Sequence, residues 1–350
     1  MTVLDFLTET TKQGASDLFI VAGRPLSYKI GGKFLEYGDQ RVMPEQTDNL
    51  VAEIYQLARR DIARLRQTGD DDFSFAIQGL SRYRVSTYVQ RGSLAAVIRV
   101  ITFALPDPEK LGIPSQVIGL SGLKKGLVLV TGPAGSGKST TLACIIDQIN
   151  RTMEKHIITL EDPLEYLHRH QKSIISQREV SSDTASYTVA LRAALRQSPD
   201  VILLGEMRDY ETISIAMTAA ETGHLVLSTL HTLGAANTID RIIDVFPSSQ
   251  QRQIAVQLAS VLQAVVSQQL VPAASGGVTA AFELMTATTA VRNMIRENKI
   301  HQIDGLIYSS STDGMFSMDT SLLKLCKAGR IGREEALAHS TNPDMLARKL

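Results

Sequence analysis

The sequence predicts an α/β protein of two domains, the second of which is built on a mainly parallel sheet. Its 350 residues suit two domains of roughly 150 residues each. Short helical and alternating patterns fill the chain up to about residue 100, whereas apolar runs separated by amphipathic helical segments follow from residue 126. Three prolines within residues 103–115 interrupt both periodicities. The expected division is therefore a first domain at 1–102, a linker at 103–115 and a second domain at 116–350.

The first domain is expected to be α+β. Its last three segments alternate apolar and polar residues, as in an antiparallel sheet with one face exposed to water. In its longest helical segment, Leu50, Ile54 and Leu57 share one stripe. The expected elements, in order, are a helix at 6–16, strands at 17–23 and 26–37, a helical stretch at 43–69, and strands at 70–79, 81–92 and 93–101.

Apolar runs predict the strands of the second domain, and amphipathic segments predict its helices. A helix over 139–150 follows the first run. A long helix is expected over 249–270, because its apolar residues, from Ile254 to Val265, fall on one face. From about residue 273 to 350 the tail is expected to be mostly helical. The expected strands lie at 126–132, 156–162, 200–206 and 224–231.

The composition is that of a soluble globular protein. Hydrophobic residues make up 44% of the chain. The 36 Lys and Arg residues balance 36 Asp and Glu residues, and this absence of net positive charge disfavours binding of nucleic acid through the overall electrostatic field of the protein. The two cysteines, Cys144 and Cys326, are too few for a disulfide framework or a four-cysteine zinc site and suit a reducing cytoplasm. The start of the chain is unlike a signal peptide, and no stretch reaches the ~20 apolar residues that cross a bilayer.

The segment GPAGSGKST matches the phosphate-binding loop G-x-x-x-x-G-K-[ST], between an apolar strand and an amphipathic helix. The glycines let backbone N–H groups turn toward phosphates, and the helix N-terminus adds the positive end of its dipole. We expect Lys138 to reach the β- and γ-phosphates and the Ser139 hydroxyl to bind Mg²⁺. The expected nucleotide-binding residues are Gly132, Pro133, Ala134, Gly135, Ser136, Gly137, Lys138, Ser139 and Thr140.

Acidic residues end two of the expected strands. Glu206 ends the run at 200–206, at the sheet edge where ligands of such folds bind, and a carboxylate there can orient and deprotonate the attacking water. The usual acid after such a strand is an Asp that binds Mg²⁺, so the second protein ligand of the metal stays open. Glu161 and Asp162 end the run at 156–162, where they either bind magnesium through water or cap the next element.

Four segments together resemble the secretion ATPases that drive type II secretion and type IV pili. GPAGSGKST, ITLEDPLEY, LLGEMRDYETI and TAAETGHLVLSTLHT look like the Walker A, aspartate, Walker B and histidine boxes of that superfamily. SQREVSSDTASYTVALRAALRQSPDVILLGEMRD is similar to the pilus retraction branch, the PilT-type ATPases, and the resemblance covers nearly the whole chain. The chain departs from the family at Phe19, where His is frequent, and at Ser228, where Gly is common. A segment that resembles a retraction-branch motif comprises Ala290, Val291, Arg292, Asn293, Met294, Ile295, Arg296 and Glu297.

The resemblance implies an N-terminal α+β domain of the PAS-like type and a C-terminal RecA-like P-loop ATPase core. It implies a motor that hydrolyses ATP with Mg²⁺ and powers type IV pilus retraction and twitching motility. The implied partners are the other subunits of a homohexamer and an inner-membrane pilus platform protein, and it stays open whether a sister retraction ATPase works with them. The implied location is cytoplasmic, at the inner face of the bacterial membrane, and neither nucleic acid nor zinc is expected.

Two histidines of the histidine box, His224 and His231, are seven positions apart. This spacing differs from the i, i+4 pair that places two zinc ligands on one helix face. His224 also suits a core role at the start of its strand, whereas His231 follows the strand. The resemblance implies that His224 or His231 lies near the γ-phosphate and reports hydrolysis. A neutral imidazole that donates to a phosphate oxygen loses that bond when the phosphate leaves.

Four arginines of the first domain, Arg82, Arg84, Arg91 and Arg99, lie on adjoining expected strands. Arg82 and Arg84 are two positions apart and therefore share a face of one strand. Such a face is either simply solvated, or it contributes charge to a nucleotide as arginine fingers do. The resemblance implies the second role, in a ring whose first-domain arginines close over bound ATP.

Three alternative functions remain beside retraction. A pilus assembly or type II secretion ATPase is the first, although assembly ATPases generally carry a longer N-terminal extension and a four-cysteine motif that are not in this sequence. A RecA-like nucleic-acid motor is more remote, because no basic and aromatic stretch is present and Trp is absent. A regulator that binds the nucleotide without hydrolysing it is the third.

Overall fold

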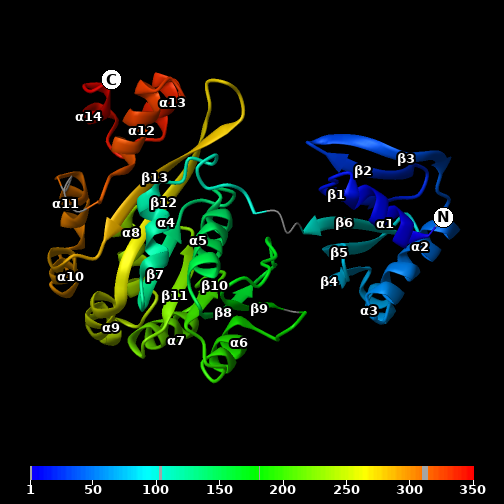
Figure 1. Cartoon of the computed structure of the whole chain (residues 1–350), viewed down its shortest axis with the longest axis horizontal. Coiled ribbons are helices and arrows are strands. Elements are labelled where there is room, and N and C mark those ends of the chain that lie inside the picture. The colour runs from blue at the N-terminus through cyan, green and yellow to red at the C-terminus, as the bar shows by residue number, and fades with distance from the viewer. Residues whose placement is uncertain (1, 102–104, 181, 310–313) are drawn as a thin grey trace. The chain divides into compact units, whose positions relative to one another are not determined.

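The structure, a computed structural model, shows two compact units, Met1–Ala104 with Glu165–Leu167 in one and Leu105–Leu164 with His168–Leu350 in the other (Figure 1). Each unit has its own sheet and its own hydrophobic core. The residues described are 2–101, 105–180, 182–309 and 314–350. Residues 103 and 104, at the start of the expected linker, lie outside the described residues.

The first unit is an antiparallel sheet with its helices. Its elements are α1 (Val3–Lys12), β1 (Asp17–Ile20), β2 (Pro25–Ile30), β3 (Lys33–Arg41), α2 (Pro44–Leu57), α3 (Ala63–Thr68), β4 (Asp70–Ile77), β5 (Ser81–Gln90) and β6 (Ser93–Ile101). The strands lie in the order β3-β2-β1-β6-β5-β4. Phe6 of α1, Ile54 of α2 and Tyr83 of β5 belong to one core. The α+β architecture expected for this part of the chain is therefore present.

The helical stretch expected over 43–69 is two helices rather than one. Arg59 has a positive φ of 52°, a conformation that cannot continue a right-handed helix and that follows the end of α2. Arg60 then donates from Nε and Nη2 to the two carboxylate oxygens of Asp71, each at 2.9 Å. The Asp71 side chain is fully buried. An unpaired buried charge costs about 3–5 kcal/mol of stability. The turn at Arg59 avoids this cost, because it brings the guanidinium group of Arg60 to Asp71.

The second unit is built on a seven-stranded sheet. Its strands are β7 (Gly126–Thr131), β8 (His156–Glu161), β9 (Ile174–Glu179), β10 (Val201–Leu204), β11 (Leu225–Leu230), β12 (Leu262–Pro272) and β13 (Val278–Thr286). They lie in the order β13-β12-β7-β11-β10-β8-β9, and all neighbours pair in parallel except β12 with β13. The four runs expected to be strands are β7, β8, β10 and β11.

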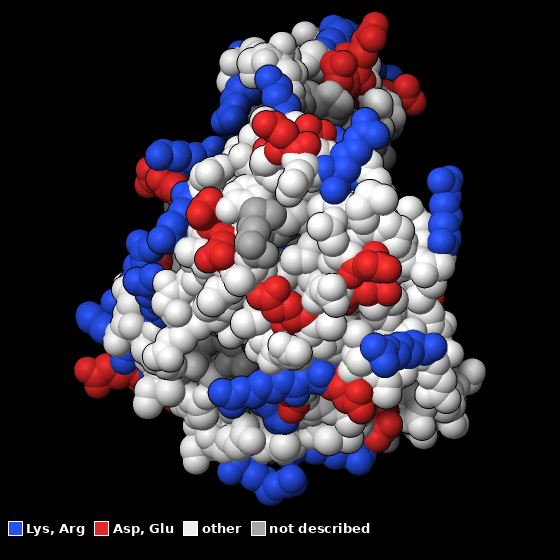
Figure 2. Space-filling model, turned by 90° about the vertical axis from the view of Figure 1, so that its right-hand side faces the viewer, with Lys and Arg blue, Asp and Glu red and all other residues white. Residues whose placement is uncertain are grey.

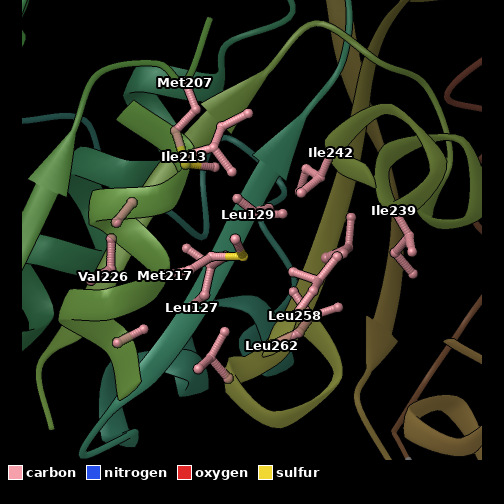
Figure 3. Close-up of a cluster of buried hydrophobic side chains, with 14 of the residues drawn as sticks. Leu127, Leu129, Met207, Ile213, Met217, Val226, Ile239, Ile242, Leu258 and Leu262 are labelled. Carbon is pink, nitrogen blue, oxygen red and sulfur yellow. The ribbon is translucent and has the colours of Figure 1, made fainter. Parts of the chain in front are cut away.

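Helices cover both faces of this sheet, which explains why β7 and β11 are buried along their whole length. Val128 and Val130 of β7 pack on one face with α5, and Leu127 and Leu129 pack on the other with α6 to α9. Figure 3 shows the second layer, where side chains from α7, α8 and α9 meet those of β7. The helices are α4 (Ser115–Ile118), α5 (Lys138–Thr152), α6 (Tyr187–Ala194), α7 (Tyr210–Glu221), α8 (Ala235–Asp244) and α9 (Ser248–Val261).

The long helix expected over 249–270 is wrong in its second half. Helix α9 ends at Val261, and the next residue begins β12, which pairs with β7 and with β13. Leu262, Val265 and Val266 continue the helical spacing of Leu258, and such a short apolar pattern suits a buried helix and a strand buried on both faces alike. Val265 does face the same core layer as Ile254 and Leu258, but from a strand.

The tail expected to be mostly helical from about residue 273 begins with strand β13 and is helical only after it. One cluster of its apolar residues, including Met318 and Leu322, packs against Val271 and Ala281 of the two last strands. The helices are α10 (Thr289–Arg296), α11 (Ile303–Ser309), α12 (Met318–Lys327), α13 (Arg333–Ala338) and α14 (Pro343–Ala347), with two short 3₁₀ turns in this unit, η1 (Gly119–Gly122) and η2 (Ile300–Gln302).

Charges of both signs are mixed on the face of the molecule that Figure 2 presents. Lys and Arg are interspersed there with Asp and Glu. This pattern differs from the continuous basic surface with which proteins neutralise the phosphates of nucleic acids. Within the described part of the chain, no helix combines the length and the apolar character needed to span a membrane.

Candidate nucleotide site

Parallel strands bring most of the expected site residues to one edge of the second sheet. Leu204 of β10 lies opposite Leu160 of β8 and Ser228 of β11, so that these strands end at nearly the same level. The phosphate loop follows β7, the two acids of the aspartate box end β8, Glu206 follows β10, and His231 follows β11. The carboxyl edge of a parallel sheet is where ligands bind in folds of this type.

The phosphate loop leads from β7 into α5 through three glycines with positive φ. The angle is 144° at Gly132, 75° at Gly135 and 87° at Gly137. Residues with a side chain rarely adopt these angles, so the backbone itself requires glycine at these positions. Helix α5 begins at Lys138, directly after the last glycine. The N–H groups of its first turn have no partners within the helix and are available to an anion at the loop.

Side chains of the loop provide a cation and hydroxyl groups. Lys138 is buried, and its Nζ donates to the carbonyl oxygens of Gly132 and Pro133, each at 2.9 Å. The hydroxyls of Thr131 and Ser136 are buried and have no hydrogen-bond partner among the described residues. A buried ammonium group and these two hydroxyls fit a phosphate, whose charged oxygens accept strong hydrogen bonds from such donors.

Glu206 is held at the sheet edge by two basic side chains. Its carboxylate accepts a charged hydrogen bond from Arg208, and His231 Nε2 lies 3.3 Å from Glu206 Oε2. Burial raises the pKa of Glu206, whose side chain is 12% exposed, but the Arg208 guanidinium and then His231 outweigh this effect and hold the pKa below its ordinary value. Glu206 is therefore ionised near neutral pH, the state in which a carboxylate can accept a proton from water.

The two histidines of the histidine box lie at opposite ends of β11. His231 follows the strand and contacts Glu206. His224 precedes the strand, and its Nδ1 lies 2.9 Å from the carbonyl oxygen of Ala219 near the end of α7. Because a strand rises about 3.3 Å per residue, roughly 20 Å separates the two residues. The structure thus places His231, and not His224, beside Glu206, and the two cannot bind one metal ion together.

The acids of the aspartate box lie near a half-buried tyrosine, Tyr187. Glu161 is half-buried and Asp162 is exposed. Tyr187, the first residue of α6, packs so closely on Gly205 that a side-chain carbon there would lie 2.7 Å from the Tyr187 hydroxyl. Burial raises the pKa of Tyr187, and the carboxylates of Asp162, Glu206 and Glu161 raise it further. Tyr187 is therefore a neutral hydroxyl among three carboxylates.

A pocket of about 460 Å³ opens beside Glu206 and His231. Arg208, Arg241 and Val245 contribute to its lining, together with the end of β11. The pocket combines a carboxylate, an imidazole and two guanidinium groups, a set that suits a charged and hydrated ligand more than an apolar one. Among the described residues, no three His, Cys, Asp or Glu side chains gather as a metal site.

The expected arginine fingers of the first unit occupy two different places. Arg82 and Arg84 alternate with buried residues of β5, and Arg84 lies opposite Arg99 of β6, so these three share a solvent-facing surface. Arg99 Nε donates to Asp17 Oδ1 at 2.9 Å. The sequence predicts that Arg91 lies on a strand. The structure places it instead in the turn between β5 and β6, with a φ of 50°.

The segment that resembles the retraction motif forms α10 and the residue after it. Val291 and Ile295 face the core, and Met294 packs against it from a half-buried position. Arg292 Nη1 donates to the carbonyl oxygens of Ala259 and Ser260 at 2.5 and 3.0 Å, which caps the C-terminal end of α9. The exposed residues of the motif are Ala290, Asn293, Arg296 and Glu297.

Two residues of the site carry little or no sequence signal. Arg208 lies two positions after Glu206, but its contact with that carboxylate does not follow from the spacing alone. Tyr187 belongs to no motif, and only the packing of α6 on the end of β10 brings it to the carboxylates. Neither role could be assigned before the fold was known.

Comparisons with known proteins show which family this chain belongs to. The chain matches the family described as Type II/IV secretion system protein over residues 2–313. It is 43% identical over 345 residues to the type IV pilus retraction ATPase PilT of Pseudomonas aeruginosa, which covers 98% of this chain and 99% of that protein. It is 41% identical to a twitching motility protein of Neisseria gonorrhoeae, with 99% and 92% covered. The crystal structure of the pilus retraction motor PilT with bound ADP is similar with a TM-score of 0.90 and 46% sequence identity, over 99% of both chains.

Proposed function

This chain belongs to the family of Type II/IV secretion system proteins, and on that premise we propose how its site works. The chain is an ATPase motor that powers type IV pilus retraction and thereby twitching motility. The observation that carries this conclusion is its 43% identity, over nearly the full length of both chains, to a pilus retraction ATPase. A phosphate loop with a buried lysine supports the ATPase activity from the site itself.

Hydrolysis begins, in this proposal, with the phosphates of ATP in the loop GPAGSGKST. Lys138 exchanges its bonds to the carbonyls of Gly132 and Pro133 for bonds to β- and γ-phosphate oxygens. Glu206, kept ionised by Arg208, orients a water molecule and takes its proton as the water oxygen bonds to the γ-phosphorus. The bond from that phosphorus to the bridging oxygen breaks at the same time, which leaves ADP and phosphate.

We propose His231 as the residue that senses the γ-phosphate. An imidazole N–H that donates to a γ-phosphate oxygen loses this bond after cleavage. The segment after His231 is tied to the rest of the unit, because the Gly234 N–H donates to Ser267 Oγ of β12 at 2.9 Å and α8 begins at the next residue. A displacement of His231 therefore reaches α8. His224, at the other end of β11, is not assigned this role.

Magnesium is the proposed cofactor. The Ser139 hydroxyl and, through water, the carboxylates of Glu161 and Asp162 would hold it, and these are the oxygen donors that this cation prefers. When bound, the ion would neutralise charge on the β- and γ-phosphate oxygens. Ser139 is half-buried in the first turn of α5, directly after Lys138, which suits this task.

We propose that the motor is a homohexamer in the cytoplasm, at the inner face of the membrane, and that it acts on an inner-membrane pilus platform protein. The solvent-facing surface that Arg82, Arg84 and Arg99 share supports a ring, because arginine fingers commonly reach a nucleotide from a neighbouring surface. ATP cleavage would change the angle between the two domains of a subunit, and the ring would pass this motion to the platform protein.

Two variants test the chemistry. Glu206→Gln should still bind ATP but lower the turnover by about 10²- to 10⁴-fold, the usual contribution of a general base. Lys138→Ala should weaken nucleotide binding itself. Steady-state turnover and calorimetric titration with ADP measure the two effects separately. Unchanged turnover of Glu206→Gln would assign the base to another residue, and tight binding by Lys138→Ala would contradict the phosphate-loop assignment.

A deletion strain tests the biological role. A cell that lacks its retraction motor should keep its pili and lose twitching motility. Electron microscopy of the pili and a surface motility assay give the two readouts. Cells without pili would instead indicate a pilus assembly ATPase. Complementation with the Glu206→Gln variant, which keeps the fold and the binding loop, should fail to restore motility.

A further inference from the structure

Gln268 lies beside the phosphate loop but outside its sequence motif. It belongs to β12, which pairs in parallel with β7, and Ser267 lies opposite Thr131 in that pairing. The next residue on β12 is therefore level with Gly132, the first residue of the loop. Gln268 is 3% exposed. A buried amide carries one donor group and one acceptor group that must both be satisfied, so its partners define what it does.

The side-chain amide of Gln268 joins the two parts of the phosphate-binding element. Its Nε2 donates to the carbonyl oxygen of Ser136 in the loop at 2.7 Å. Its Oε1 accepts from the Thr141 hydroxyl in the first turn of α5, also at 2.7 Å. Ser136 and Thr141 are both buried and stand on either side of Lys138 and Ser139 in the chain. One side chain therefore sets the position of the loop relative to the helix from which Lys138 projects.

Contact with Gln268 gives a second reason for two of the loop glycines. A side-chain carbon at Gly132 would lie 2.1 Å from the backbone oxygen of Gln268, and one at Gly137 would lie 2.9 Å from Gln268 Nε2. Such distances are shorter than atoms tolerate. The loop is thus packed against β12 at its first residue and at the residue before Lys138. Its shape depends on this strand as well as on its own backbone angles.

We propose that Gln268 is a positioning residue for the nucleotide, which acts through the loop without contacting phosphate. A loop rich in glycine loses much conformational entropy when it orders around a ligand. An amide that already holds the loop against α5 removes part of that loss before binding, and this increases affinity through preorganisation. The inference rests on the proposed ATPase function. It adds to the nucleotide site a residue of β12, a strand that lies on the opposite side of β7 from the strand that Glu206 follows.

The adjacent Gln269 provides a matched control. It is also a buried amide on β12, but successive residues of a strand point to opposite faces. Its Nε2 donates to the carbonyl oxygen of His339, and its Oε1 lies 3.1 Å from His339 Nδ1. Gln269→Leu therefore removes the same chemical groups from the same strand and leaves the phosphate loop untouched.

The experiment compares Gln268→Leu, Gln269→Leu and the wild type by calorimetric titration with ADP and by steady-state ATP hydrolysis. We expect Gln268→Leu to raise the ADP Kd and the KM for ATP by about tenfold, the effect of two neutral hydrogen bonds, with kcat within about twofold of the wild type. Gln269→Leu should change none of these values. Thr141→Val alone should raise the ADP Kd by about threefold. Added to Gln268→Leu, it should not raise the Kd further, because the hydrogen bond that it removes is already absent.

Other results would overturn the inference. An unchanged Kd and KM in Gln268→Leu, or a lower kcat at unchanged KM, would show that Gln268 does not act through loop positioning. Where Gln268→Leu does not fold, Thr141→Val removes the other end of the same bridge, and wild-type affinity in that variant refutes the proposal. A wild type that binds no nucleotide would refute the proposed function instead, and the two failures are thus distinguishable.

Discussion

Replacing Glu283 by Gln should make the unfolding of this protein less sensitive to pH. Glu283 lies on β13, is 6% exposed, and accepts hydrogen bonds from the backbone N–H groups of Ala235 and Met318 at 3.0 and 3.4 Å. These are the first residues of α8 and α12. Burial raises the pKa of Glu283 to about 7, and the two N–H donors oppose this increase without cancelling it. The carboxyl thus joins two helices and is costly to ionise.

The sign and size of the effect follow from that pKa. The unfolded carboxyl ionises near its ordinary pKa of 4.5, whereas the folded one holds its proton up to about 7. The folded state therefore binds more protons between these values, and its stability is greatest below the lower pKa and falls as the pH rises through the higher one. The full difference amounts to about 3 kcal/mol, most of which is lost between about pH 5 and pH 8.

The Glu283→Gln variant stays neutral at every pH. It keeps one acceptor for one helix N-terminus and loses the other, which should cost about 1 kcal/mol at pH 5. At pH 8 the buried carboxyl of the wild type is ionised, which destabilises its folded state, whereas the amide of the variant stays neutral. The variant should therefore be the more stable of the two. The free energy of unfolding, from urea titrations followed by circular dichroism, should therefore show a crossing. Glu297→Gln, at an exposed carboxyl directly after α10, should run parallel to the wild type over this pH range. Parallel curves for Glu283→Gln would refute the reasoning.

Three further variants follow from contacts of the structure. Arg208→Gln should raise the pKa of Glu206, because it removes the cation that lowers it, and the acid limb of the ATPase pH profile should move to higher pH; an unmoved limb would show that Arg208 does not set that pKa. Asp71→Asn should destabilise the first unit by about 2 kcal/mol in a thermal scan, less than for a fully buried pair because Arg60 is partly exposed, and an unchanged midpoint would contradict this. Arg292→Met should cost about 1 kcal/mol and speed amide exchange in the last turn of α9, whereas unchanged exchange would exclude a capping role.

Much of the fold follows from the local sequence pattern. The apolar runs that became β7, β8, β10 and β11 are bounded by polar residues and glycines, and the helix after the phosphate loop has a regular apolar stripe. The loop itself is equally local, because the three positive φ angles at Gly132, Gly135 and Gly137 require the glycines that the motif displays. In this loop, the backbone conformation can be predicted from the residue types of a few neighbouring positions.

Errors occur where a pattern fits two structures. The apolar residues of 261–266, which include Leu262, Val265 and Val266, continue the helical spacing of Leu258, but they equally suit a strand buried on both faces. The pairing of β12 with β7 and β13 selects the strand, and this pairing joins segments far apart in the chain. In the same way, the pairing of Arg60 with the buried Asp71 divides a stretch whose helical pattern is unbroken.

The sequence by itself predicted that this chain binds a nucleotide and that Lys138 contacts its phosphates, because the motif that carries this prediction lies in nine consecutive residues. Only the tertiary structure decided which of two histidines stands beside Glu206, that Arg208 contacts that carboxylate, and that Gln268 holds the loop from another strand. The physical reason is that each of these contacts depends on the register of neighbouring strands and on side-chain packing between them. Register arises from the burial of whole faces, which no short segment encodes alone.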